Sequence, residues 1–352
     1  MFYKYIPIKR KENEKSIHSI LLEEDHDYST TDRSFQSVGL NTGNQVPREA
    51  IMRNLTVEKM NYQEYCMMSE TCSGVPVIVT DLIWINENSN FDYLYDRVQK
   101  FKDIIFVPMS VGLQAKNFGS EFKLNNSVKN VLSVMQERAV IGVRGEYTAD
   151  VLNKNGIKNI EIIGCPSLYY ADDPDFKIVK NKPIDSLCRV SVNFRTFYGL
   201  LSKEEKHFLT YCANGGYDFI EQTAFEFILE NVGDIDYYNY VAKWIKRKKK
   251  IFFHINEWKE FLAEFQFSMG LRFHGNVVAL WNKIPSLFIV IDSRTEELTR
   301  YFELPFIKIR DFDERKPIEY YYELADYETF NKTYRKKYLK YREFLRKNSI
   351  RK

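Results

Sequence analysis

Short apolar segments rich in β-branched residues alternate with segments of helical periodicity along most of the chain. In the first half, this pattern predicts strands at 35–40, 75–85, 104–112, 139–144 and 159–164, and helices at 43–55, 125–138 and 145–156. The second half repeats the alternation, with strands at 188–194, 217–222, 251–255, 267–271 and 285–291, and helices at 202–215, 223–232, 235–250 and 256–266 and after His274 and Asp292. Strands separated by helices of this length are typical of parallel sheets covered on both faces.

A polar segment with two prolines, 171–187, interrupts the alternation and is predicted to be a linker. It divides the chain into two α/β domains, 35–170 and 188–318, with a polar arm at 1–34 and one long basic helix at 319–352. Two such domains would face each other across a cleft. Because ligands of parallel sheets bind beyond the carboxyl ends of the strands, the candidate site residues are those that directly follow a predicted strand.

Composition narrows the functional classes. The 352 residues carry a formal net charge of only +3, which does not favour a nucleic-acid binder. The five cysteines are an odd number without a Cys-x-x-Cys pair, so neither a disulfide framework nor a structural zinc site is expected. No apolar run approaches the length that crosses a bilayer, and the first residues lack the apolar core of a signal peptide. These features predict a cytoplasmic enzyme.

The segment SMGLRFHGNVVALW joins a strand end to a helix start. Arg272 and His274 stand at this junction, followed by Gly275 and Asn276. The free backbone N–H groups and the positive dipole end of a helix start favour an anion. Arginine binds carboxylate or phosphate in a bidentate manner, and histidine transfers protons near neutral pH. The pair therefore predicts a site for an anionic substrate that needs protonation; the alternative is a helix cap beside a histidine that only fills the core.

Other strand ends carry further candidates. Asp292 and Ser293 fit a helix cap, and Arg294 opposes the helix dipole, so that it would face an acidic neighbour or an anionic ligand. Arg195 follows the first strand of the second domain and is expected in the cleft or in a surface loop. In the first domain, strand ends and a glycine-containing turn predict a cleft rim, although some of these residues also fit helix caps: Asn41, Gly43, Asn44, Gly112, Gln114, Arg144 and Glu146.

Two basic segments, 243–250 and the tail at 319–352, complete the pattern. Each is compatible with a solvated helix face or with attraction to an anionic membrane, which would suit a substrate carried on a lipid. The tail therefore raises the hypothesis of peripheral contact with the inner face of the plasma membrane. The chain has no HExxH, Walker A or G-x-S-x-G motif, and its other histidines lack metal-ligand spacing, so no metal is expected.

The segment 268–292 resembles the Arg-x-His segment of the polysaccharide pyruvyl transferase family, and 139–170 resembles that family's strand–Arg–helix–strand segment. The turn at 40–45 is similar to its amino-terminal Asn-x-Gly turn, and the matches occur in family order over about residues 36 to 307. The resemblance implies a GT-B-like fold of two Rossmann-like domains. It also implies transfer of a pyruvyl group from phosphoenolpyruvate to two hydroxyls of a sugar, with a ketal and phosphate as products and no other cofactor.

The resemblance assigns catalysis to His274, Arg272 and Arg195. The charges and helix starts of the sequence add a prediction of donor binding by Arg294, Gly275, Asn276, Asp292 and Ser293. Several positions depart from the family pattern. Arg294 stands where many members have a lysine after Tyr-Asp-Pro, Cys165 begins a Cys-Pro-Ser segment where many have Asp-Pro-Ala, and IWINENSN replaces a Gly-Gly turn. Asn44 replaces an aspartate in the amino-terminal turn. These departures lie on the predicted rim and leave the identity of the donor open.

The resulting hypothesis places Arg195, Arg272 and Arg294 around a dianionic phosphoenolpyruvate. The negative charges of the bound donor would hold His274 in its protonated form. The acceptor would be a sugar of a cell-envelope polysaccharide, such as a capsule or exopolysaccharide, or of its lipid-linked precursor. Two alternatives stay open. One is a GT-B-like glycosyltransferase that uses a nucleotide sugar, and the other is a non-catalytic member of an envelope assembly complex.

Overall fold

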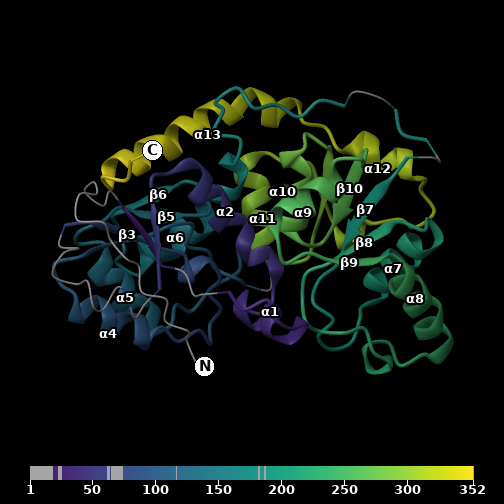
Figure 1. The fold of residues 1–352 in the computed structure, drawn as a ribbon, viewed down its shortest axis with the longest axis horizontal. Coiled ribbons are helices and arrows are strands. Elements are labelled where there is room, and N and C mark those ends of the chain that lie inside the picture. The colour runs from purple at the N-terminus through teal and green to yellow at the C-terminus, as the bar shows by residue number, and fades with distance from the viewer. Residues whose placement is uncertain are drawn as a thin grey trace.

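The computed structural model describes residues 19–22, 26–61, 64, 74–115, 117–180, 183–185 and 188–351. They form two α/β units, each built on a parallel sheet, and a long carboxyl-terminal helix extends along both (Figure 1). This arrangement confirms the predicted fold class. Most of the predicted arm and part of the predicted linker lie outside the described residues, and the exact domain boundaries stay a prediction.

The first unit has the strand order β2-β1-β3-β4, and a parallel bridge between Val111 and Val143 joins this sheet to the pair β5-β6. Side chains on its strands alternate between two apolar cores, so that Leu21 and Ile78 belong to one core and Ile20 and Val77 to the other. The strands are β1 (Ile20–Leu22), β2 (Glu58–Met60), β3 (Pro76–Val79), β4 (Ile105–Pro108), β5 (Ile141–Val143) and β6 (Ile160–Ile162). The helices around them are α1 (Thr31–Ser37), α2 (Gln45–Asn54), α4 (Asp92–Lys100), α5 (Asn126–Met135) and α6 (Glu146–Lys154).

The second unit has the strand order β12-β11-β10-β7-β8-β9, and all its pairings are parallel. The order of the strands reverses between β7 and β10: β8 and β9 follow on one side of this pair, and β11 and β12 follow on the other. At this point Gly270 of β10 pairs with Asn193 of β7. Ligands of such sheets bind in the crevice beyond this reversal. The strands are β7 (Val190–Asn193), β8 (Asp218–Glu221), β9 (Lys249–Ile251), β10 (Phe267–Gly270), β11 (Ser286–Val290) and β12 (Phe306–Lys308). The helices are α7 (Lys203–Asn214), α8 (Ile235–Lys248), α9 (Ile255–Leu262), α10 (Phe273–Trp281) and α11 (Ser293–Phe302).

The carboxyl-terminal segment forms two helices, α12 (Ile318–Leu324) and α13 (Glu328–Lys347), so the prediction of one continuous helix is wrong. The break occurs because Tyr327 turns into the core, where its hydroxyl bonds to the backbone oxygen and nitrogen of Ser286 at 2.6 and 3.1 Å. From there α13 crosses to the first unit (Figure 1), where Asn348 exchanges two hydrogen bonds with the backbone of Val140. Its buried face is aromatic and follows helical spacing: Phe330, Tyr334, Tyr338, Tyr341 and Phe344.

Three other sequence predictions are wrong. Residues 35–40 form the end of α1 and a turn instead of a strand, because Thr30 caps the helix and Gly39 and Leu40 both adopt positive φ. The predicted helix at 223–232 is a loop with one short 3-10 turn, and Gly233 (φ 67°) separates it from α8. The strand β1 lies inside the predicted irregular arm, where only three residues carry its pattern.

Candidate active site

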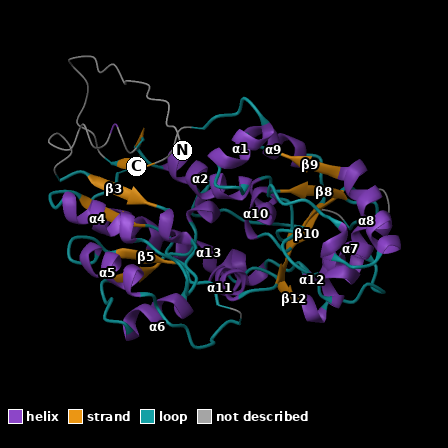
Figure 2. Ribbon diagram, turned by 90° about the horizontal axis from the view of Figure 1, so that it is seen from below, coloured by secondary structure: helices purple, strands orange, loops and turns teal. Residues whose placement is uncertain are grey.

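A cavity of about 420 Å³ lies between the two units, at the carboxyl ends of their strands. Its wall contains three arginines and a histidine, and no aspartate or glutamate is found among the described residues that line it. In Figure 2 the helices α2, α10 and α11 occupy this central region between the sheets. The polar and charged lining residues are Asn41, Asn44, Gln114, Arg144, Thr196, Gln222, Thr223, Arg272, His274, Arg294 and Thr295. The cavity is therefore cationic.

Arg272 is the residue before α10, directly after β10, and its guanidinium is held by the loop that follows β7. Its Nε donates to the backbone oxygen of Phe194 at 3.1 Å, and Nη2 donates to the hydroxyl of Thr196 at 2.5 Å. Burial lowers the pKa of Arg272 to about 10, and the nearby Glu221 carboxylate opposes this shift. The side chain remains cationic near neutral pH and is fixed before any ligand arrives.

Arg195 does not line the cavity, contrary to the predicted convergence of three arginines. Its guanidinium forms an ion pair with Glu205 and donates to the backbone oxygens of Thr196 and Tyr198 at 2.7 and 3.0 Å. Since a further donor bonds to the backbone oxygen of Leu200, this group is occupied within its own loop. Arg195 therefore orders the loop that carries Thr196.

Arg144 supplies the third cation of the cavity, together with Arg272 and Arg294. The sequence places it on the rim, but its side chain is only 2% exposed and packs against Gly112. Burial lowers the pKa of Arg144 to about 10. Arg294 is half-buried and lies 3.7 Å from the carboxylate of Asp292, which partly balances its charge.

His274 lies in the first turn of α10, and its Nε2 is 3.6 Å from the thiol sulfur of Cys165. Burial, followed by the positive charges of Arg144, Arg294 and Arg272, lowers the pKa of His274 well below its ordinary value of 6.5. Without a ligand the imidazole is therefore neutral at neutral pH. An anion in the cavity would offset the three cations and favour its protonation.

The amino-terminal turn of the first unit reaches the second unit. Asn41 pairs with Thr223 in an isolated antiparallel bridge, and a Cβ at Gly43 would lie 2.6 Å from Oε1 of Gln222, so that a larger residue would displace this side chain. The side chain of Asn44 donates to the backbone oxygen of Val38 at 3.1 Å. Asn41 and Asn44 line the cavity as predicted for the rim.

Several predicted donor residues instead hold the structure around the cavity. Asn276 is fully buried and bonds to Asn193 and to the backbone of Gly270, and Gly275 leaves no room for a Cβ beside Asn193. Asp292 accepts from Gln114 at 3.1 Å, and the hydroxyl of Ser293 accepts from the backbone nitrogen of residue 115 at 2.8 Å. These last two contacts join the units. Glu146, predicted on the rim, is exposed and does not line the cavity.

A carboxylate that sequence reasoning missed also joins the units. Glu297 of α11 accepts hydrogen bonds from the backbone nitrogen and hydroxyl of Thr148 at 2.6 and 2.8 Å, at the start of α6. Burial raises the pKa of Glu297 to about 7, although the bonds from Thr148 and the charge of Arg144 act in the opposite direction. The residue places a titrating group directly behind the cationic wall.

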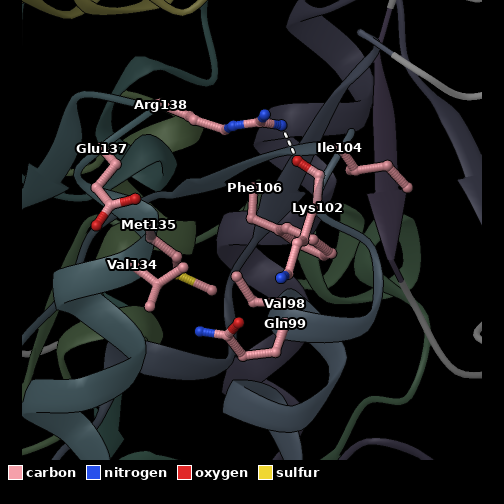
Figure 3. Close-up of a pocket in the computed structure, with 9 residues that line it drawn as sticks. All are labelled: Val98, Gln99, Lys102, Ile104, Phe106, Val134, Met135, Glu137 and Arg138. Carbon is pink, nitrogen blue, oxygen red and sulfur yellow. Dashed lines mark hydrogen bonds between the residues drawn. The ribbon is translucent and has the colours of Figure 1, made fainter.

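A second hollow of about 290 Å³ lies on the first unit, between the ends of α4 and α5 beside the start of β4. Figure 3 shows its wall of mixed apolar and polar side chains, with Arg138 donating to the backbone oxygen of Lys102 across one edge. It contains no histidine and none of the residues predicted for the site. Its chemistry does not match an anion-binding site with a proton donor.

In the part of the chain that the structure describes, no helix has the length and apolar character needed to cross a membrane. Within the same residues, no group of three or more His, Cys, Asp and Glu side chains is arranged to hold a metal ion.

Comparisons with known structures give distant matches. A functionally uncharacterised protein from Klebsiella pneumoniae is 15% identical with a TM-score of 0.41, covering 81% of this chain and 88% of that one. A protein described as a putative UDP-N-acetylglucosamine 2-epimerase from Listeria monocytogenes is 8% identical with a TM-score of 0.46, covering 91% of each chain. The UDP-GlcNAc 2-epimerase of Methanocaldococcus jannaschii is 11% identical with a TM-score of 0.36, covering 83% and 88%.

A search of curated protein sequences found no match to the chain. The sequence model for polysaccharide pyruvyl transferases, by contrast, matches residues 4–293, which is more than half of the 352 residues. This match includes Arg144, Arg272 and His274 of the cationic wall and ends one residue before Arg294. The chain therefore belongs to the polysaccharide pyruvyl transferase family.

Proposed function

We propose that this transferase moves a pyruvyl group from phosphoenolpyruvate to two hydroxyls of a sugar in a cell-envelope polysaccharide or its precursor. The observation that carries the proposal is the charge of the cavity: Arg144, Arg272 and Arg294 line it beside His274, and no lining residue described by the structure is acidic. Phosphoenolpyruvate carries a carboxylate and a phosphate, which are the groups that guanidinium binds best. The start of α10 adds backbone N–H groups to the same wall.

Donor binding would prepare His274 for proton transfer. The neutral imidazole lies among three cations, which hold its pKa low. Bound anions would cancel that field and stabilise the imidazolium, so a proton would be taken up as the donor binds. The enzyme would then carry its acid only when the molecule to be protonated is present.

In the proposed reaction, protonated His274 gives its proton to the methylene carbon of the donor, and a sugar hydroxyl oxygen bonds to the adjacent carbon. The proton of that hydroxyl passes to the imidazole. The bond from this carbon to the phosphate oxygen then breaks, a second sugar hydroxyl bonds to the same carbon, and its proton passes to the departing phosphate, which leaves as hydrogen phosphate. One donor and one sugar diol thus give one cyclic ketal and one phosphate.

The direct test is phosphate release from phosphoenolpyruvate in the presence of a panel of saccharides, with the ketal product identified by mass spectrometry. Arg272→Ala should abolish the release, and Arg310→Ala, an exposed arginine outside the cavity, should leave it unchanged. Phosphate release that survives in Arg272→Ala would contradict the proposal. Absence of turnover with every acceptor, together with an unaltered cellular phenotype in Arg272→Ala, would favour the non-catalytic alternative.

A thermal-shift comparison separates this donor from a nucleotide sugar. A ligand that binds only the native state, at a hundred times its Kd, stabilises it by about 2.7 kcal/mol. Stabilisation by phosphoenolpyruvate, with none by UDP- or GDP-sugars, is expected. The reverse result would favour the glycosyltransferase alternative, in which the same arginines hold a diphosphate.

The proposal extends to a cytoplasmic location and to an acceptor linked to a lipid, with the basic carboxyl-terminal helix contacting the inner face of the plasma membrane. The support is the composition of α13, whose aromatic face is buried while lysines such as Lys336 and Lys340 are exposed. Co-sedimentation with phosphatidylglycerol vesicles, lost at high salt, is the expected result. Equal recovery with vesicles of phosphatidylcholine would remove this part of the proposal.

A further inference from the structure

We propose that Trp84 of the first unit and Phe225 of the second form the two aromatic walls of the acceptor-sugar subsite. The inference rests on the proposed function, because it assigns the acceptor to the part of the cavity that the arginines leave open. Both side chains line the same cavity as Arg272 and His274. Neither was named as a site residue from the sequence, although Trp84 lies in the segment IWINENSN that departs from the family pattern.

Exposure is the first observation. The side chains of Trp84 and Phe225 are 50% and 42% exposed, although aromatic residues of this size normally bury most of their surface in a core. A third exposed apolar residue, Leu40, lines the same cavity. Large apolar side chains that gather at the mouth of a polar cavity mark a surface that a ligand covers.

The two rings are also held in place. The indole nitrogen of Trp84 donates to the side-chain oxygen of Gln114, whose nitrogen donates in turn to Asp292 at 3.1 Å. The ring of Phe225 packs against that of Tyr198 at an interplanar angle of 81°, with the centroids 6.2 Å apart. These contacts order both aromatic walls while the two residues stay exposed, so little side-chain entropy is lost when a ligand stacks on them.

The polar groups beside the rings match the hydroxyls of a sugar. Asn41, Thr196 and Thr223 line the same cavity and offer amides and hydroxyls without charge. Gln222 also lines it, is only 1% exposed, and its Nε2 has no hydrogen-bond partner among the described residues. A buried donor of this kind costs free energy until it finds an acceptor, which a sugar hydroxyl would supply.

A pyranose fits this combination because its ring presents apolar C–H groups on its faces and hydroxyls around its edge. A nucleobase could stack on the same rings, and the experiment has to separate the two. In a pyruvyl transferase, the two hydroxyls that accept the pyruvyl group would lie toward His274, with the remainder of the sugar between the aromatic walls. The structure thus predicts that acceptor affinity and donor affinity depend on different residues.

The test compares Trp84→Ala and Phe225→Ala with the wild-type enzyme and with Tyr320→Ala, an equally exposed aromatic outside the cavity. Phosphate release at saturating phosphoenolpyruvate gives the acceptor KM, and calorimetry gives the Kd of phosphoenolpyruvate. Each cavity variant should raise the acceptor KM about 5- to 150-fold, which is the range expected for loss of one stacking contact, with the donor Kd unchanged. Trp84→Phe should recover most of the loss, and Tyr320→Ala should match the wild type.

Binding of the methyl glycosides of galactose, glucose, mannose, N-acetylglucosamine and N-acetylmannosamine is measured separately by calorimetry, without donor. If the wild type releases no phosphate from phosphoenolpyruvate but binds a glycoside through Trp84, the proposed reaction fails and the sugar subsite stands. Glycoside binding or acceptor KM that is equal in the wild type and both cavity variants would overturn the subsite. So would binding of no glycoside at all, or a dependence on Trp84 that is found for UDP alone.

Discussion

Glu297 connects the protonation of one buried carboxyl to the stability of the whole protein. The side chain is only 1% exposed and bonds to Thr148 across the contact between the two units. Burial raises the pKa of Glu297 to about 7 from an ordinary value of 4.5. The folded protein therefore holds this proton more tightly than the unfolded chain. The stability that this group contributes is complete below pH 4.5 and is lost as the pH rises to about 7.

The size of the effect follows from the two pKa values. At about 1.36 kcal/mol for each pKa unit, the interval corresponds to about 3 kcal/mol, most of it lost between about pH 5 and pH 8. Glu297→Gln removes the titration and keeps one oxygen that accepts from Thr148. As the pH rises across that range, the free energy of unfolding of the wild type should therefore fall by about 2 to 3 kcal/mol relative to that of the variant.

Urea unfolding of the wild type and of Glu297→Gln at several pH values between about 5 and 8 measures this difference. Comparing the two proteins at each pH cancels the titration of other groups, such as His274. Glu146→Gln serves as the control, since Glu146 is exposed at the start of α6, the helix that carries Thr148, and the variant should show the pH dependence of the wild type. Parallel stability curves for the wild type and Glu297→Gln would refute the reasoning.

Four further predictions concern the cavity. Arg144→Met should weaken phosphoenolpyruvate binding about 10- to 100-fold in calorimetry, because one charged hydrogen-bond donor is lost; an unchanged Kd would contradict this. His274→Gln should lower turnover about 10²- to 10⁴-fold with an unchanged melting temperature, and near-normal turnover would remove the imidazole from the mechanism. Cys165→Asp places a carboxylate near Nε2 of His274 and should raise its pKa, so the pH–rate profile should move to higher pH instead of superimposing on that of the wild type. Gly43→Ala brings a Cβ to 2.6 Å from Gln222 and should cost about 1 to 3 kcal/mol in urea unfolding, whereas wild-type stability would show that the turn can adapt.

The sequence predicts the order of most strands and helices because the longer apolar segments have a clear period. It misses β1 and β12, since three residues are too few to show an alternation and each strand is defined by its neighbours in the sheet. The helix predicted at 223–232 fails for a related reason: Phe225, Ile228 and Leu229 are exposed, and Phe225 lines the cavity, so the apolar residues are not buried together on one helical face.

In the candidate site, too, some residues were predictable from the sequence and others were not. Arg272, His274 and Arg294 were predictable because each lies at the start of a helix that follows a strand of a parallel sheet, and such positions face the crevice. That Arg144 lines the cavity and Arg195 does not was not predictable, because the direction in which an arginine side chain points after a strand depends on its partners. Glu205, ten residues along the chain, draws Arg195 into its own loop. No local pattern in the sequence reports that choice.

The path of the last helix has a consequence for how the protein is synthesised. The first unit lacks two of its backbone partners until the end of the chain arrives: Asn348 bonds to Val140, and the backbone oxygen of Arg351 accepts from Thr56. Phe344 also packs close to Gly142 of β5, in the interior of that unit. A ribosome that has released only the amino-terminal half therefore exposes an incomplete product, whose closure waits for α13 and the residues that follow it. A stop codon before Asn348 would accordingly damage the half of the protein that is translated first.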